Sequence, residues 1–240
     1  MGPVSDVALG LERSPAITIL IPAFREGKRI AATVAAARRG AEGWGPVEIV
    51  VVDDGSPDDT AAQAEAAGAD RVLRLARNRG KGGALRAGLA AAGGDLLVTL
   101  DADLGESAIG WPALAAPIAA GEADLTIAVL PPVGKAGGFG WALRAARWGV
   151  QMLTGRRLEA PLSGQRAFSR TTWEQIGRLD PGFGAEVGMD VDALRAGLRV
   201  VEIRTDMCHR PTGRTLPGFA HRARQMVAVL RALARRMGGQ

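Results

Sequence analysis

Two carboxylates follow an apolar run near the middle of the chain. Leu96 to Leu100 is long enough for one buried strand, and Asp101 and Asp103 come directly after it with one small residue between them. Side chains two positions apart in an extended backbone point to the same side, and converging carboxylates repel each other unless a cation lies between them. Mg²⁺ and Mn²⁺ bind carboxylate oxygens and leave positions open for phosphates. The spacing therefore favours a metal–diphosphate site, although Asp-x-Asp also occurs as a solvated turn.

Strands and helices alternate along the first half of the chain. The hydrophobic pattern predicts strands over 17–21, 47–52, 71–75, 96–100 and 124–129, and helices over 26–39, 57–67, 81–92 and 111–120. Such alternation with short connections predicts an α/β fold, a mostly parallel sheet with helices on both faces. Ligands of these sheets bind beyond the carboxyl ends of the strands. Segments 22–26, 53–56 and 101–103 all fall at such ends, so we expect them to line one crevice.

Two familiar phosphate-binding fingerprints are absent. A P-loop needs Ser or Thr after its lysine, but Gly82 follows Lys81. A dinucleotide fingerprint should follow the first strand, where residues 22–27 contain a single glycine. Lys81 at the start of a predicted helix, between glycines that permit close approach, still suits an anionic group.

Composition indicates a globular protein, whose length allows one large domain or two small ones, and we expect a single domain over residues 1–240. The chain is 47% apolar and carries +5 net charge, with the basic excess concentrated in the last 40 residues. That excess favours an anionic partner or a solvated basic helix. A single cysteine, Cys208, excludes an intrachain disulfide, and neither a membrane span nor a signal peptide is evident. We expect a cytoplasmic protein, with membrane association at the inner face as an alternative, and no nucleic-acid partner because no recognition motif is present.

The second half offers fewer patterns. Residues 131–139 are rich in glycine and favour either a mobile loop over the site or a simple linker. A helix is expected over 140–153, with Trp141 and Trp148 as packing residues, followed by strands over 167–169 and 200–203. Between these strands a helix runs to Ala196, and Glu186 near its start is favoured by the helix dipole. Glu186 could act as a general base, orient a sugar, or be a helix-terminal acid without chemistry.

The C-terminal segment 218–237 predicts an amphipathic basic helix. Its expected apolar stripe comprises Phe219, Met226, Leu230, Leu233 and Met237. The surrounding arginines are Arg222, Arg224, Arg231, Arg235 and Arg236. Such a helix could pack on the domain, pair with another subunit in a homodimer, or lie on an anionic membrane.

Four segments in this order resemble family 2 glycosyltransferases with the GT-A fold. They are Ile21–Glu26, Val52–Thr60, Asn78–Gly82 and Asp101–Leu104, within residues 15–130. The resemblance is to the branch containing polyprenyl-phosphate sugar synthases and glucosyl-3-phosphoglycerate synthases. It implies a nucleotide-sugar-binding half over 15–130, an acceptor half over 131–217, and the basic helix over 218–240.

The resemblance implies a nucleotide site in the first half. The residues carried over are Pro22, Ala23, Phe24, Glu26, Asp53, Lys81, Asp101 and Ala102. Asp53 would accept a hydrogen bond from the base, Glu26 would contact the base or ribose, and Asp101 would face the ribose or the metal. Asp103 would bind Mg²⁺ or Mn²⁺ at the diphosphate and is, with Glu186, a candidate catalytic residue. The family, not these residues, favours UDP over GDP.

The acceptor-side residues resemble both branches. Ser163, Gly164, Gln165 and Arg166 are similar to the Ser-Gly-x-Arg segment of polyprenyl-phosphate sugar synthases, with Gln165 and Arg166 contacting sugar or phosphate; a solvated turn is the alternative. His209 matches a metal ligand of the phosphoglycerate branch, to be weighed against a structural histidine. Arg210 and Arg214 are candidate phosphate contacts.

Together these features predict a metal-dependent glycosyltransferase. It would move a sugar from a nucleotide sugar, UDP favoured, to a phosphorylated acceptor such as polyprenyl phosphate or a small phospho-acid. The alternatives are a nucleotidyltransferase, whose Gly-rich basic loop after the first strand is absent, and a non-catalytic nucleotide-binding protein. Sugar, acceptor and anomeric outcome stay open, because the chain carries features of an inverting and a retaining branch.

Overall fold

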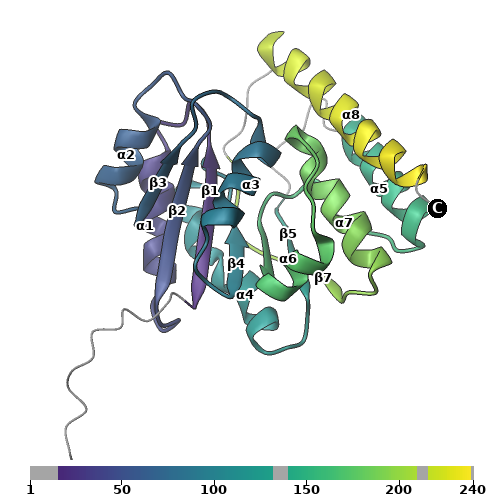
Figure 1. Cartoon of the computed structure of the whole chain (residues 1–240), viewed down its shortest axis with the longest axis horizontal. Coiled ribbons are helices and arrows are strands. Elements are labelled where there is room, and N and C mark those ends of the chain that lie inside the picture. Colours follow the sequence, from purple (N-terminus) through teal and green to yellow (C-terminus); the bar gives the residue numbers. More distant parts are fainter. Residues whose placement is uncertain (1–15, 132–139, 210–215, 239–240) are drawn as a thin grey trace, which may run out of the picture.

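The computed structural model describes residues 16–131, 140–209 and 216–238 (Figure 1). Its strands are β1 (Ile17–Ala23), β2 (Val47–Asp53), β3 (Arg71–Arg74), β4 (Leu96–Thr99), β5 (Leu125–Val129), β6 (Arg166–Ser169) and β7 (Val200–Arg204). Its helices are α1 (Ile30–Gly40), α2 (Thr60–Ala66), α3 (Lys81–Ala91), α4 (Pro112–Ala119), α5 (Gly140–Thr154), α6 (Arg170–Ile176), α7 (Ala185–Arg195) and α8 (Leu216–Met237). Two short 3₁₀ helices are η1 (Gly105–Gly110) and η2 (Gly182–Gly184). The predicted leader 1–15, residues 132–139 of the predicted loop, Arg210 and Arg214 lie outside the described residues.

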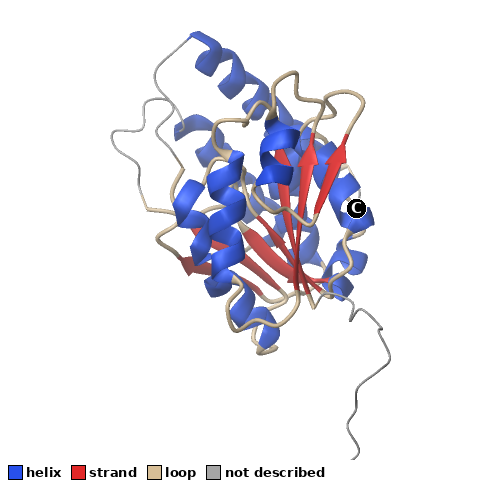
Figure 2. Cartoon of the chain, turned by 90° about the vertical axis from the view of Figure 1, so that its left-hand side faces the viewer, coloured by secondary structure: helices blue, strands red, loops and turns tan. Residues whose placement is uncertain are grey.

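The strands form one sheet in the order β3-β2-β1-β4-β6-β5-β7. Every neighbouring pair is parallel except those of β6, which runs antiparallel between β4 and β5. Helices cover both faces (Figure 2). The predicted α/β fold with a mostly parallel sheet is therefore confirmed.

Successive residues of a strand point into two hydrophobic cores, one on each face of the sheet. Ile19 and Ile21 pack with Val34 of α1 and Leu114 of α4 on one face. Leu20 points to the opposite face, where α3, α5, α7 and α8 contribute their buried residues. Because side chains alternate along a strand, a fully apolar strand such as β1 supplies both cores and is covered on both sides.

Two helices begin later than the sequence pattern predicts, because polar side chains fix the loops that precede them. The helix predicted from residue 26 begins at Ile30, since the Glu26 amide donates to Thr60 Oγ1 at 2.9 Å and Arg25 adopts φ +60°. The helix predicted from residue 57 begins at Thr60, whose amide donates to Asp58 Oδ1 at 3.3 Å. Both polar contacts hold the loop outside helical geometry.

The predicted packing of Trp141 and Trp148 on α5 is wrong, and the predicted apolar stripe of α8 is buried only in part, at Leu233. Trp141 and Trp148 of α5 are exposed, not packing residues. On α8 the helix buries Gln225, Val229, Ala232, Leu233 and Arg236, while Leu230 and Met237 of the predicted stripe are exposed. The physical reason is that α8 approaches α5 at Gly149, where a Cβ would collide with Leu233, and this contact sets which side of each helix is covered. No helix within the described ranges is both long and apolar enough to cross a membrane.

Candidate active site

Five strands bring their polar ends to one edge of the sheet. Ala23 at the end of β1 lies beside Asp53 at the end of β2, and Thr99 at the end of β4 lies beside Arg166, where antiparallel β6 begins. β7 ends at Arg204 on the same edge, and the chain then runs to His209. The expected convergence of segments 22–26, 53–56 and 101–103 is explained by this register.

Asp101, Asp103 and His209 form a potential metal site. Each offers one ligand atom, and these atoms lie within 4.8 Å of one another. His209 Nδ1 is 2.9 Å from Asp103 Oδ1, and its Nε2 is 3.5 Å from Asp101 Oδ2. Two carboxylates with one imidazole suit Mn²⁺, and the carboxylates alone suit Mg²⁺. The side chains therefore fit a divalent cation, as the resemblance implies.

Lys81 links the metal-ligand carboxylates to α7. Its ammonium forms ion pairs with Asp101 and, at 2.8 Å, with Glu186 Oε1. Burial alone would lower the pKa of Lys81, but the charges of Asp101 and Glu186 outweigh burial and raise that pKa. Burial likewise would raise the pKa of Asp101, but Lys81 and His209 reverse the effect and lower it. Lys81 is thus a fixed cation, and Asp101 is held as an anion.

The 163–165 segment reaches the same cluster. Gln165 Nε2 donates to Asp101 Oδ2 at 2.8 Å, and Ser163 Oγ donates to Gln165 Oε1 at 3.0 Å. A Cβ at Gly164 would collide with Lys81 and Asp101, so glycine permits the close approach. Thr99 Oγ1 donates to the Gly164 carbonyl at 2.7 Å and holds the segment in place. Three of the four predicted residues therefore surround the site.

The Arg166 side chain points elsewhere, which corrects its expected role as a sugar or phosphate contact. It is 2% exposed, and its guanidinium forms a buried ion pair with Asp190 of α7. Its Nε also donates to the Ser163 carbonyl at 2.8 Å. Burial of a charge is tolerated only when it is paired, and the partner Asp190 lies in the core. Arg166 therefore fixes the 163–165 segment against α7 and makes no open contact in the crevice.

The loop after β2 is shaped by its own polar residues. Asp53 Oδ1 accepts from the Ser56 amide at 3.0 Å, and Asp54 Oδ1 accepts from the Arg79 amide at 2.7 Å. Gly55 has φ +71° and lies so close to the Arg77 backbone that a side chain would not fit. These contacts join the loop after β2 to the segment leading into α3 and Lys81. The predicted contact of Asp53 with a base stays a prediction.

The loop after β1 lies beside the loop after β2. Ala23 is buried, Pro22 and Glu26 are half-buried, and Phe24 is exposed. Glu26 pairs with Arg29 at 2.9 Å, yet burial dominates and raises the Glu26 pKa. Phe24 is the one aromatic side chain of this loop, and the Arg25 guanidinium lies 5.3 Å from its ring centroid. These four residues remain predicted nucleotide contacts.

Three positioning contacts were not predicted. Thr33 Oγ1 donates to the Ala102 carbonyl at 2.8 Å and accepts from the Gly105 amide at 2.9 Å, which holds the Asp101–Asp103 turn. Ser107 Oγ accepts from the Cys208 amide at 3.0 Å, which anchors the residue before His209. These pairs are separated by 69, 72 and 101 positions, and no short-range pattern identifies them.

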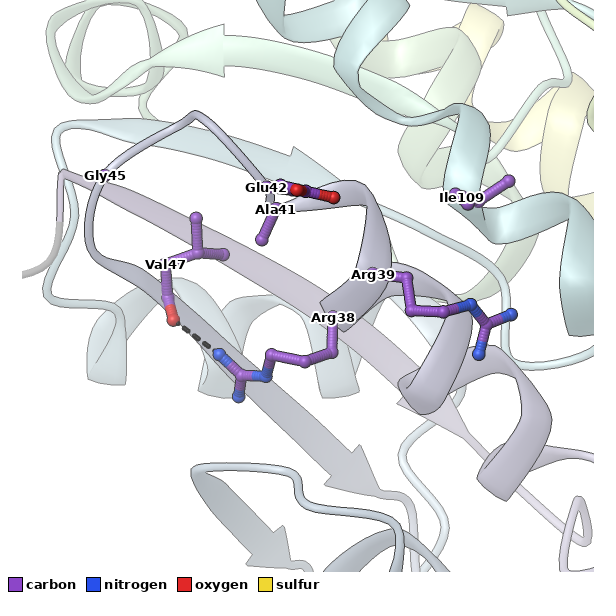
Figure 3. A pocket seen from close by; sticks show the side chains of 7 residues that line it. All are labelled: Arg38, Arg39, Ala41, Glu42, Gly45, Val47 and Ile109. Carbon is purple, nitrogen blue, oxygen red and sulfur yellow. Dashed lines mark hydrogen bonds between the residues drawn. The ribbon is translucent and has the colours of Figure 1, made fainter.

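A shallow hollow elsewhere on the surface is a poor alternative site (Figure 3). It is lined by Arg38, Arg39, Ala41, Glu42, Gly45, Val47 and Ile109. Arg38 is already paired with Asp70, and Arg39 with Glu106. Glu42 is the one carboxylate of its lining, and no group of three potential metal ligands gathers there within the described residues, so the strand-end cluster is the better candidate.

The fold and the cluster together define a class of enzyme: a GT-A-like sheet with a metal-ready acidic pair beyond its central strand. Comparison with known proteins agrees. The model of the family described as glycosyl transferase family 2 matches residues 18–175. This chain therefore belongs to that family and is a glycosyltransferase. The family membership also decides against the nucleotidyltransferase and non-catalytic alternatives.

The chain resembles relatives from both expected branches. It is 30% identical to the glucosyl-3-phosphoglycerate synthase of Mycolicibacterium paratuberculosis over 89% of this chain and 71% of that protein. It is 35% identical to the mouse dolichyl-phosphate beta-glucosyltransferase over 36% of this chain and 31% of that protein. A crystal structure of the Mycobacterium tuberculosis glucosyl-3-phosphoglycerate synthase with Mn²⁺, UDP-glucose and phosphoglyceric acid is 27% identical, covers 92% of this chain and 80% of that one, and gives a TM-score of 0.74.

Proposed function

We propose that this enzyme transfers a sugar from a UDP-sugar to a phosphorylated acceptor, with Mg²⁺ or Mn²⁺ held by Asp101, Asp103 and His209. The observation that carries the proposal is the gathering of these three ligands with Lys81 and Glu186 at the strand ends. The relatives named above support it, because structures of the mycobacterial synthase contain UDP with Mg²⁺ or Mn²⁺. When bound, the cation would supply positive charge to the diphosphate leaving group.

The protein's own residues divide the remaining work. The loops after β1 and β2 would hold the nucleoside, with Asp53 and Glu26 as acceptors and Phe24 against the base. Lys81 supplies a fixed positive charge beside the diphosphate position, where it stabilises negative charge as the glycosidic bond breaks. Glu186 is held by Lys81 at 2.8 Å and would orient the sugar.

The acceptor is expected on the side of Gln165 and Glu186. Transfer to a phosphate oxygen needs no strong base because that oxygen is already anionic, whereas a hydroxyl of a phospho-acid must lose its proton, for which Glu186 is the candidate general base. The synthases of small phospho-acids are similar over 89–93% of this chain, whereas the match to the dolichyl-phosphate enzyme covers 36%. This coverage favours a small phosphorylated acid over a lipid phosphate as the acceptor.

Product analysis tests the proposal. The enzyme is incubated with UDP-glucose and Mn²⁺, and with either 3-phosphoglycerate or a polyprenyl phosphate, and UDP release and glycosylated product are measured. UDP and a glycosylated phospho-acid are expected, and both are lost in Asp103→Asn with the circular dichroism unchanged. Product from the polyprenyl phosphate alone would move the acceptor to the lipid class. Full activity of Asp103→Asn would refute the metal assignment.

A further inference from the structure

Helix α5 exposes a stripe of large apolar side chains. Trp141, Trp148 and Met152 are 74%, 62% and 65% exposed. Their spacing of seven and four residues places them on one side of the helix. The buried residues Ala142, Ala146, Gly149 and Val150 lie on another side. An exposed stripe that includes two tryptophans is costly in water and indicates an interaction surface.

Helix α8 exposes a second apolar stripe. Val227, Leu230 and Met237 are exposed, and their spacing of three and seven residues also follows one side of a helix. Val229 and Leu233 on the covered side pack into the core. Each of the two helices therefore has two apolar sides: one packs into the core, and the other faces solvent.

The two exposed stripes lie on the same side of the helix pair. Gly149 of α5 meets Leu233 of α8, and Arg195 donates to the carbonyls of both Leu153 and Arg236, so the helices run parallel and side by side (Figure 1). On α5, helical spacing places the exposed stripe next to the side that contacts α8, turned away from the core. On α8, it places the exposed stripe next to the side that contacts α5, also turned away from the core. The stripes thus border the seam between the helices on the side away from the core. We call Trp141, Trp148, Met152, Val227, Leu230 and Met237 the outer α5–α8 surface.

The charged side chains of the two helices have one sign. Residues 140–154 and 216–237 contain no Asp or Glu. The exposed arginines on the two helices include Arg144, whose guanidinium lies 5.8 Å from the Trp141 ring centroid, and Arg231, which lies next to Leu230 and one turn after Val227. Arg235 is exposed too but is paired with Asp180. Exposed apolar side chains on two helices that carry arginines and no acidic residue match the chemistry of anionic lipid headgroups over an acyl layer.

We propose that the outer α5–α8 surface docks on an anionic lipid membrane. Tryptophan rings sit at the headgroup level of a bilayer, and nearby arginines attract lipid phosphates. A second copy of this chain is a weaker match, because a two-fold interface through this surface would bring two acid-free, arginine-rimmed faces together. This docking goes beyond the proposed sugar transfer and does not depend on which acceptor is used.

Vesicle co-sedimentation of the full chain tests the docking. Vesicles of phosphatidylcholine alone are compared with vesicles containing phosphatidylglycerol, at low and high salt. We expect binding to the anionic vesicles to be at least about tenfold tighter, since each basic residue near the membrane adds electrostatic attraction to the lipid phosphates. High salt should weaken this binding. The double substitution Trp141→Ser with Trp148→Ser should lose most of this binding. Ile109→Ser, which changes an exposed apolar residue outside this surface, should retain it.

Three results would overturn the docking. They are no vesicle binding, equal binding to both vesicle types, and a dimer in light scattering that the double tryptophan variant converts to a monomer. The last would assign the surface to contact between copies. Donor turnover in solution by the double variant separates the two proposals, because loss of vesicle binding with normal turnover concerns only the docking.

Discussion

Helix α7 carries two sets of ionic groups that differ in their charge balance. At its start, Glu186 and Asp101 share the ammonium of Lys81, and Asp103 lies beside Asp101 in the potential metal site. Further along, Asp190 is matched by Arg166 in a buried pair. Asp192 of α7, and Asp180 in the loop that precedes it, are likewise paired with two arginines of α8, Arg235 and Arg236. The acids paired with arginines are structural. The cluster of Asp101, Asp103 and Glu186 has an excess of negative charge and is partly open to solvent, so it is the cluster suited to bind a cation.

The largest expected effect comes from breaking the matched set. Arg236→Met leaves two carboxylates, Asp180 and Asp192, without their buried partner, so the free energy of unfolding should fall by about 3–5 kcal/mol in urea denaturation. Arg231→Met, an exposed arginine of the same helix, serves as the control and should change it by less than about 0.5 kcal/mol. Equal stability of the two variants would mean that the buried network does not hold α8 in place.

The next largest effect concerns the acidic cluster of the potential metal site. Asp103→Asn removes a metal ligand and relieves repulsion, so kcat should fall by about 10²–10³ while the melting temperature is kept or raised. Asp95→Asn changes a fully solvent-facing carboxylate at the other end of the same central strand and is the matched control. A loss of stability parallel to the loss of activity would show that Asp103 belongs with the structural acids instead.

Lys81 joins the site to α7, and its removal sharpens the comparison. Lys81→Met should lower kcat/KM about 10- to 100-fold, because hydrogen bonds to charged groups contribute about 1.5–3 kcal/mol. It also leaves Asp101 and Glu186 uncompensated, so added Mn²⁺ should raise the melting temperature more in this variant than in the wild type. Lys28→Met, at an exposed lysine, is the control. A smaller Mn²⁺ effect in Lys81→Met would contradict the idea that lysine and metal neutralise the same carboxylates.

The smallest expected effect is at the turn that carries the acidic pair. Thr33→Val removes the two hydrogen bonds that hold the turn, and unfolding should become easier by about 1–3 kcal/mol. Thr33→Ser keeps the hydroxyl and should restore most of that stability. If serine and valine behave alike, the hydroxyl contacts do not matter and packing of the side chain does.

The sequence could predict the sheet and the site because both follow from local patterns. Apolar runs end in polar clusters, and parallel strands must bring those ends together, which places Asp53 and Asp101 on one edge without any knowledge of contacts. The resemblance then supplied Lys81, Gln165 and His209, and the structure brings these three side chains to Asp101.

The failures concern which partner a side chain meets. Arg166 was expected in the crevice because the Ser-Gly-x-Arg segment resembles that of polyprenyl-phosphate sugar synthases, but alternation along β6 turns it inward to Asp190. Of the apolar stripe predicted for α8, Leu233 faces the core while Leu230 and Met237 are exposed, because a helix with apolar residues on two sides does not show which side the core covers. Thr33 and Ser107 act across 69 to 101 positions, and such contacts exist only once the chain is folded.

A thermal-shift titration with UDP, with and without Mn²⁺, tests the metal-site assignment most directly. Binding to the folded state raises the melting temperature by mass action. UDP with Mn²⁺ should raise it well above either alone in the wild type and in Asp95→Asn, and the metal-dependent part should vanish in Asp103→Asn. An equal shift in Asp103→Asn, or a UDP shift independent of Mn²⁺, would contradict a cation held by Asp101, Asp103 and His209.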